Sequence, residues 1–336
     1  MAFVRFLLFI PLGLSALSAS AQDIHFSQFY ASPLTLNPSL TGFHEGSYRL
    51  TGIYRNQWRS VTSPYQTFGA SFDMRLLQSK LKDVLGAGIS ILYDKAGDGN
   101  LSLMGTMASA SFHKALGKDN NHFIGIGIQL GFAQRSLDYN SLSFPEQYVN
   151  GSFVLTQPNG ENFSGSTVNY FDMNAGLLWT SQFGKRLGVF AGTTFFHLTQ
   201  PKESFLGDND YRLHLRELAH AGLNIRANEH FYITPNFLFM HQNKAKEVNL
   251  GSAAEYHFKD THNTILSLGG WYRLDDAPIV SASLEHRSIR IGVAYDVNTS
   301  ELQPASSHRG AFEISILYIG KISRVEAPLL VPCPRL

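Results

Sequence analysis

Thirteen histidines and many serines and acidic residues give the chain side chains that could bind a metal or catalyse hydrolysis. Their spacing supports neither role. No His-Glu-x-x-His motif is present, and His214 and His220 are six residues apart, which is long for neighbouring ligands. The segment from Asp94 to Asn100 has the glycines of a hairpin turn and lacks the acidic spacing of a calcium loop. Because no Gly-x-Ser-x-Gly elbow occurs either, we predict no catalytic residues, no cofactor and no metal site.

Composition excludes further classes of function. The chain has 27 Lys+Arg against 26 Asp+Glu, a net charge of +1, so it has no excess of positive charge for binding nucleic acid. The single cysteine, Cys333, cannot form a disulfide framework or a cysteine-ligated metal site. Residues 1–21 have the pattern of a secretory signal peptide, in which an apolar run ends in the small-residue cleavage site Ala19-Ser20-Ala21. We therefore expect an exported protein.

After residue 45 the sequence alternates between apolar and polar side chains. In residues 122–135, for example, alternate positions from Ile124 to Phe132 are apolar, and the positions between them are mainly glycine. This period of two predicts β-strands with one apolar and one polar face. The predicted strands are residues 47–59, 65–75, 85–93, 101–114, 122–135, 169–181, 187–198, 212–226, 231–242, 247–258, 264–274, 278–286, 289–298 and 310–320.

The length of these segments and of their connections indicates a membrane barrel. Tilted membrane strands need about 9–11 residues, whereas globular strands average about 5–6, and most of the predicted strands reach the longer value. The long connections, residues 136–168, 199–211 and 299–309, all follow odd-numbered strands, as external loops of outer-membrane barrels do. We predict an all-β fold, a transmembrane antiparallel β-barrel of about 14 strands over residues 46–320, in the lipid bilayer of the outer membrane. A soluble β-sandwich or propeller is the alternative.

Two flanking segments do not continue the strand pattern. Residues 22–45 contain Pro33 and Pro38 but enough apolar residues to argue against disorder, so we predict an extended N-terminal segment. This segment either enters the lumen as a plug or lies along the periplasmic mouth. With an even number of strands, both this segment and the short proline-rich tail, residues 321–336, are expected to emerge on the periplasmic side.

Three arginines recur on the polar face of the first predicted strand, namely Arg49, Arg55 and Arg59. We predict that they face the lumen and form a salt-bridge ladder with residues such as Asp73 and Glu217. A ligand-binding stripe is the alternative.

Distinctive sequence blocks stand at both ends of the chain. The N-terminal blocks are residues 22–30 (QDIHFSQFY) and 36–42 (LNPSLTG). The C-terminal blocks are residues 270–273 (GWYR), 292–298 (GVAYDVN), 310–313 (GAFE) and Cys333-Pro334. These blocks resemble the PorP/SprF family of type IX secretion membrane proteins, in which Ala is more usual at the position of Ser39. The resemblance covers essentially the whole mature chain, with looser similarity between the blocks.

The resemblance implies a non-enzymatic outer-membrane component of type IX secretion in Bacteroidota. Such proteins look like adaptors or anchors for secretion and surface attachment of cargo with a type IX C-terminal signal domain, including gliding adhesins. Their partners would be other secretion components and the cargo itself. The aromatic residues of the loop at 136–168 have the composition of a recognition surface. The candidate partner-binding residues are Phe26, Phe29, Tyr30, Asn37, Pro38, Phe144, Tyr148, Phe153, Cys333 and Pro334. The alternative function is an outer-membrane channel for small or hydrophobic solutes.

Overall fold

The computed structural model describes most of the chain between residues 23 and 322. The described ranges are 23–61, 63–78, 83–117, 121–161, 163–206, 211–259, 263–301 and 303–322. The predicted signal peptide and most of the predicted tail, including Cys333 and Pro334, lie outside the described residues.

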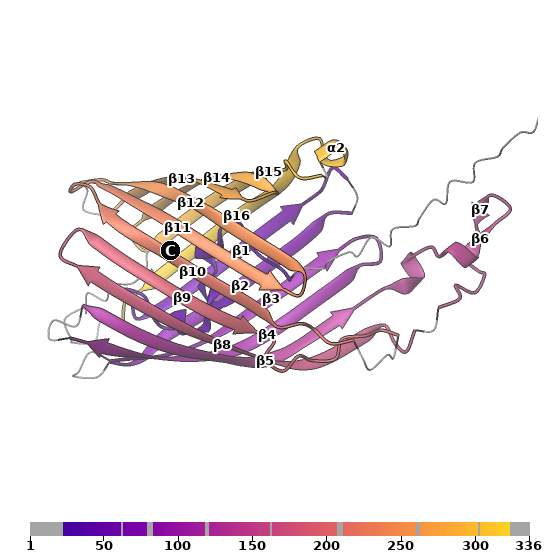
Figure 1. The fold of residues 1–336 in the computed structure, drawn as a ribbon, viewed down its shortest axis with the longest axis horizontal. Helices are drawn as coiled ribbons and strands as arrows, with labels where there is room; N and C mark the ends of the chain where they lie inside the picture. Colours follow the sequence, from indigo (N-terminus) through magenta and orange to yellow (C-terminus); the bar gives the residue numbers. More distant parts are fainter. Residues whose placement is uncertain are drawn as a thin grey trace, which may run out of the picture.

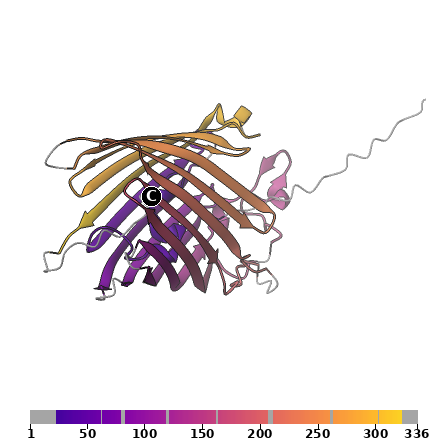
Figure 2. The ribbon, with the colours of Figure 1, turned by 60° about the vertical axis from the view of Figure 1, so that its left-hand side comes forward.

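The described chain forms a closed antiparallel barrel of fourteen strands, which confirms the predicted fold class (Figure 1). Strand β1 pairs with β2 on one side and with β16 on the other, and this second pairing closes the wall. The barrel strands are β1 (Tyr48–Gln57), β2 (Tyr65–Gln78), β3 (Val84–Ala96), β4 (Leu101–Leu116), β5 (His122–Ser136), β8 (Thr167–Phe183), β9 (Leu187–Phe196), β10 (Arg216–Arg226), β11 (Phe231–Gln242), β12 (Ala245–His257), β13 (Ile265–Arg273), β14 (Ala277–His286), β15 (Ile289–Val297) and β16 (Arg309–Gly320). All are tilted relative to the barrel axis, as Figure 2 shows.

Helical structure is confined to short pieces. The α-helices are α1 (Pro33–Leu36) and α2 (Gln303–Ser306), and the 3₁₀ turns are η1 (Phe29–Ala31), η2 (Pro38–Leu40), η3 (Tyr139–Ser141) and η4 (Pro145–Gln147). No helix in the described ranges has the length and apolar character needed to cross a membrane. The two-residue strands β6 (Tyr148–Val149) and β7 (Ser152–Phe153) pair only with each other, in the loop between β5 and β8.

The two faces of the wall differ in chemistry as the alternation predicts. On β5, Ile124, Ile126 and Ile128 point outward and are about half exposed (48–54%), whereas Phe123 and Gln129 face inward and are buried. The same apolar exposure recurs on the outer face of most other strands, from Phe68 on β2 to Ile316 on β16, whereas the outward positions in the first half of β10 carry Glu217 and small residues. An apolar belt of this kind is the lipid-contacting surface of a membrane barrel.

The barrel has two unlike ends. At one, the turn end, β1 begins, β16 ends and connections such as residues 184–186 are short. At the other, the loop end, lie the long connections at residues 137–166, 197–215 and 298–308. In outer-membrane barrels the short turns are periplasmic and the long loops external.

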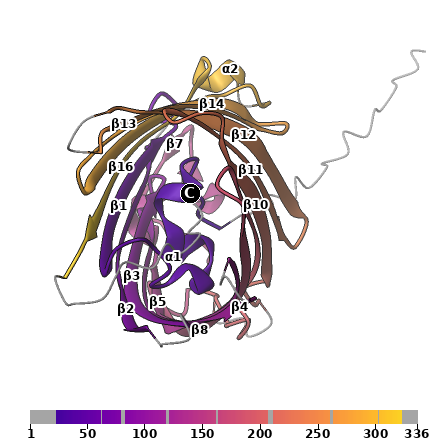
Figure 3. The same cartoon turned by 90° about the vertical axis from the view of Figure 1, so that its left-hand side faces the viewer.

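Residues 23–45, which we call the lumenal segment, lie inside the barrel wall, as Figure 3 shows. The segment runs from the loop end to the turn end. Asp23 contacts Gln242, the last residue of β11, at the loop end. At the other extreme, Ser47 donates its N–H to the carbonyl of Gly320 at the turn end, and β1 begins there. The expectation that this segment emerges on the periplasmic side is therefore corrected. Its first described residue lies near the external loops, because its polar and apolar partners are distributed along the lumen.

The outward position of Ile126 predicts a large penalty for a charge there. Replacing Ile126 with Arg should lower the free energy of unfolding in a bilayer by about 2–4 kcal/mol, because a guanidinium near the bilayer midplane loses its hydration. Phe132→Arg, on the same face and nearer the loop end, is the matched control and should cost about 0–1 kcal/mol, since the penalty falls toward the interface. Equal costs at the two positions would contradict this placement of the hydrocarbon belt.

Candidate functional site

The first half of the lumenal segment is held by a cluster of buried charged side chains around Ser27. Arg55 lies 2.5 Å from a carboxylate oxygen of Glu313, and Arg273 lies 2.7 Å from Asp296. All four charged residues are at most 3% exposed, and two positive charges meet two negative ones. Ion pairs buried this deeply need additional hydrogen bonds to offset the loss of hydration.

Those additional hydrogen bonds come from the lumenal segment. The backbone N–H groups of Ser27 and Gln28 donate to the two carboxylate oxygens of Glu313, at 2.7 and 2.8 Å. The Ser27 hydroxyl donates to Asp296 at 2.7 Å and accepts from Arg273, also at 2.7 Å. Four strands, β1, β13, β15 and β16, are thereby joined through one serine that belongs to none of them.

A second anchor holds the other end of the segment. Arg49 forms a two-pronged pair with Asp73, with N–O distances of 3.0 and 2.8 Å, and also donates to the carbonyl of Leu40 at 2.9 Å. The same carboxylate accepts the N–H of Gly42 at 2.7 Å. Charge-assisted hydrogen bonds in this geometry are about twice as strong as neutral ones. Asp73 is fully buried, so these donors must replace the hydration that its carboxylate has lost.

Asn37 is the anchor in the middle. Its amide nitrogen donates to the carbonyl of Leu177 on β8 at 3.0 Å and lies 3.1 Å from His220 on β10. Its side-chain oxygen accepts from both the backbone N–H and the hydroxyl of Ser39. Because Pro38 holds Asn37 in an extended conformation, the side chain is aimed at the wall.

Glycines on the inner wall let the segment approach the strands closely. A Cβ atom added at Gly127 would lie 2.3 Å from the backbone of Pro38, and one at Gly176 would lie 2.0 Å from the Asn37 side-chain oxygen. Separations below 3.0 Å do not occur in folded proteins, so any larger residue forces the segment away. The glycines of the alternating pattern thus form the floor on which the segment lies.

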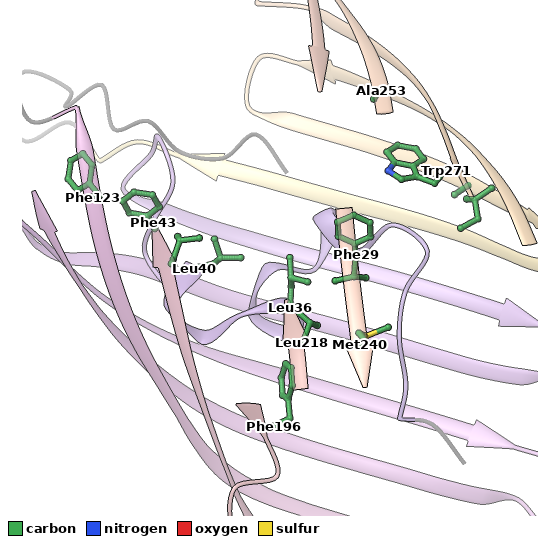
Figure 4. Close-up of a cluster of buried hydrophobic side chains, with 14 residues drawn as sticks. Phe29, Leu36, Leu40, Phe43, Phe123, Phe196, Leu218, Met240, Ala253 and Trp271 are labelled. Carbon is green, nitrogen blue, oxygen red and sulfur yellow. The ribbon is translucent and has the colours of Figure 1, made fainter. Parts of the chain in front are cut away.

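Apolar packing fills the remaining lumen. Figure 4 shows side chains of the lumenal segment meeting inward-facing side chains of the wall. From the segment come Phe29, Leu36, Leu40 and Phe43, and from the strands Phe123, Phe196, Leu218, Met240, Ala253 and Trp271. A packed apolar core therefore occupies much of the lumen.

At the loop end the segment finishes beside a histidine held between two carboxylates. His197, directly after β9, places Nδ1 2.7 Å from Asp172 and Nε2 2.5 Å from Asp23. Burial alone would lower the pKa of His197, but the two carboxylates outweigh it and raise the pKa to about 9. The ring is therefore an imidazolium at neutral pH and donates to both acids.

A cavity of about 100 Å³ lies between this histidine and the wall. Its lining includes Phe26, Leu34, Met107, His197 and Arg216. Ligand pockets usually reach about 300–1,000 Å³, so a space of this size suits a few water molecules better than a drug-sized solute. The described residues contain no group of three or more His, Cys, Asp and Glu side chains placed to hold a metal ion.

The candidate residues predicted from sequence fall into two groups. Phe26, Phe29, Asn37 and Pro38 are buried and Tyr30 half-buried, so their contacts are with the barrel itself. In the external loop Tyr148 and Phe153 are more than half exposed and lie edge to face at 5.1 Å. Phe144 is half-buried and packs against Phe163, which stacks on Tyr139.

Two expectations about charged residues are corrected. Arg49, Arg55 and Asp73 face the lumen, but Arg59 follows the end of β1, is exposed, and lies beside outward-facing side chains. Glu217 is exposed and lies 3.5 Å from His241, because the inward positions of β10 are its even-numbered residues. The end of β1 places Arg59 outside the lumen, and the phase of β10 turns Glu217 outward. Neither feature follows from composition.

Sequence reasoning missed the partners of the first anchor and of His197. Arg273, Asp296 and Glu313 stood only within resembling blocks, without a structural role, and Asp172 was not singled out. The available signal was strand phase, since an ionisable residue on the polar face of a membrane strand needs a lumenal partner.

Comparison with known protein families identifies one family over nearly the whole chain. The family described as "Type IX secretion system membrane protein PorP/SprF" matches residues 18–318. No curated protein matches the chain.

Among solved structures, the chain is similar to the Ralstonia pickettii toluene transporter TbuX, with a TM-score of 0.51 and 11% identity over 86% of this chain and 92% of that one. It is also similar to the P. putida toluene transporter TodX, with a TM-score of 0.51 and 10% identity over 88% and 95%. At these identities the similarity concerns the fold alone. Together with the family match, the closed barrel makes this an outer-membrane protein.

The close approach at Gly127 predicts that adding one methyl group will displace the lumenal segment. Gly127→Ala should lower the free energy of unfolding by about 1–3 kcal/mol, as overpacking of a filled core does, and should raise single-channel conductance. Gly105→Ala is the matched control, because Gly105 lines the lumen on the neighbouring strand with nothing within 4 Å of the added atom. If both variants behave like the wild type, the segment does not lie on this floor.

The His197 contacts predict a loss of stability in alkaline solution. Since the folded pKa of about 9 exceeds the ordinary value of 6.5, the stabilisation is complete below pH about 6.5 and is lost as the pH rises through about 9. The thermal unfolding midpoint of the wild type should therefore fall more between pH 7 and pH 10 than that of His197→Gln. Parallel pH profiles for the two proteins would show that the imidazolium does not hold the segment.

Proposed function

The chain belongs to the PorP/SprF family of type IX secretion system membrane proteins, and from this membership we propose that it acts as an adaptor or anchor. In this role it assists secretion and cell-surface attachment of cargo that carries a type IX C-terminal signal domain, such as a gliding adhesin. It performs no catalysis and interacts through its external loops and its predicted C-terminal tail.

The observation that carries the proposal is the filled lumen. The lumenal segment is fixed at Ser27 and Gly42 by carboxylates of the wall, and at Asn37 by the backbone carbonyl of Leu177. A protein that conducts solutes needs a path through this space, whereas an adaptor needs only a stable frame that presents binding surfaces on either side of the membrane.

The external surface suited to cargo is the loop of residues 137–166. It extends beyond the barrel wall, with β6 and β7 at its tip (Figure 1). Tyr148, Phe153 and Leu155 are 53–62% exposed there, although the loop also buries its own Gln147. Aromatic side chains on a locally folded hairpin anchor protein interfaces because they bury much area at a small cost in entropy.

The periplasmic surface is the region where the chain leaves the barrel. Ile322 donates its N–H to Ser47 at the turn end, so the predicted tail starts on the side where secretion components inside the envelope are accessible. The proline-rich sequence of residues 321–336 suits docking in an extended form.

The channel function remains the alternative, and it requires the lumenal segment to move. The solved structures that share the fold are transporters. Solute conductance by the unmodified purified protein would favour this alternative, and its absence together with conductance by Gly127→Ala would favour the adaptor.

The adaptor proposal predicts that the external hairpin is needed for cargo display but not for assembly. Tyr148→Ser combined with Phe153→Ser, or deletion of residues 145–162, should leave a heat-modifiable barrel in the outer membrane and strongly reduce surface-attached cargo. Leu206→Ser with Tyr211→Ser is the control, since these side chains are equally exposed in the neighbouring external loop. Normal cargo display by the hairpin variants would remove the hairpin from the proposal.

A further inference from the structure

A groove on the outer wall of the barrel differs from the apolar belt around it. It has a volume of about 550 Å³ and lies at the loop end of β1, β15 and β16. Its lining combines cationic and aromatic side chains: Tyr54, Asn56, Arg59, Tyr295, Arg309 and Phe312. Neither the lumenal anchors nor the external hairpin contribute to it.

The groove carries two uncompensated positive charges. Arg59 and Arg309 are exposed, and no acidic side chain is among the lining residues. Within the described chain, neither guanidinium has a carboxylate within ion-pair distance. The planar guanidinium forms paired hydrogen bonds with phosphate oxygens, so two of them facing one groove favour a phosphorylated ligand.

The segments that carry the two arginines are joined to each other. The N–H of Trp58 donates to the carbonyl of Gly310 at 3.2 Å, next to both arginines in sequence. The hydroxyl of Ser60 donates to the carbonyl of Ser306 at 3.1 Å. The β1–β2 turn and the start of β16 are therefore tied together, which holds the backbone positions of Arg59 and Arg309 on the same groove.

The apolar part of the groove continues directly into the lipid-contacting surface. Phe312 and Tyr295 point outward and are 45% and 39% exposed, and Ile314 follows on the same face of β16 at 43%. Aromatic residues concentrate where the hydrocarbon ends and the headgroups begin. A ligand with its phosphate on the arginines would thus have its hydrocarbon on the belt below.

We propose that this groove binds a phosphorylated glycolipid of the outer leaflet, with the phosphate between Arg59 and Arg309 and the acyl chains against Phe312 and Ile314. The loop end is the external end of an outer-membrane barrel, so the headgroups at this level belong to the outer leaflet. Charge complementarity selects the phosphate, and continuity with the apolar belt selects a lipid over a soluble anion.

The test measures lipid binding by the full-length protein in neutral phosphatidylcholine nanodiscs. The probes are diphosphorylated lipid A, the same lipid without phosphates, and inorganic phosphate as a soluble competitor. The variant is Arg59→Gln with Arg309→Gln. Arg186→Gln is the matched control, because Arg186 is exposed in the β8–β9 turn at the opposite end of the barrel. Heat-modifiable migration in gels verifies that each variant is folded.

We expect the double variant to bind diphosphorylated lipid A about tenfold more weakly or worse, as the loss of charge-assisted hydrogen bonds implies. The Arg186→Gln protein should bind as the wild type does, and the wild type should bind the phosphate-free lipid as weakly as the double variant. Millimolar inorganic phosphate should not displace the lipid.

Three results would overturn the proposal. The first is unchanged lipid A binding by the folded double variant. The second is equal affinity for the phosphorylated and phosphate-free lipids. The third is full displacement by inorganic phosphate, which would assign the groove to a soluble anion.

Discussion

The deepest carboxylates sealed inside this barrel depend on donors that the strands alone do not supply. Glu313 and Asp73 are fully buried, and each accepts backbone N–H groups of the lumenal segment in addition to its arginine. Removing one partner of such a buried set is far more costly than replacing the whole set, because the remaining charge loses both hydration and pairing. The segment and the wall are therefore mutually dependent, and the barrel closes on its own N-terminal residues as other domains close on a core.

The strands could be predicted because their signal is local. Contact with lipid requires an apolar residue at every second position, and each of the fourteen predicted segments overlaps one barrel strand. The ends of the strands were predicted less accurately, since the alternation continues into residues that lie outside the sheet. The predicted strand at 212–226 begins in the structure at Arg216, and residues 211–215 form the loop instead. The lumenal position predicted for Arg59 was wrong for the same reason, because β1 ends at Gln57.

The position of the lumenal segment could not be predicted, because its partners are remote in sequence. Ser27 meets Glu313 across 286 residues, and Asn37 meets Leu177 across 140. Alternation identifies Glu313 and the glycines of β5 as inward-facing, but it does not say what they face. The inward-facing glycines are the sequence signal that bears on the position of the lumenal segment. Successive glycines on an inward face leave a gap about one side chain deep, and a wall that is not a water-filled channel must fill this gap with backbone. Residues 22–45, with little strand character and many apolar side chains, were the segment available to fill it.

The arrangement separates three tasks onto three surfaces. The inner face binds the chain's own N-terminal residues, the outer face contacts lipid, and the loop between β5 and β8 extends beyond the wall (Figure 1), where the proposed partners would bind. A channel with this inner face would have to release the lumenal segment before a solute could pass. Here the inner face is committed by ion pairs, by the Asn37 hydrogen bonds and by glycines that fit only this occupant. Changes in the loops and the predicted C-terminal tail can therefore alter partners without disturbing the core, which is the property that the proposed adaptor role requires.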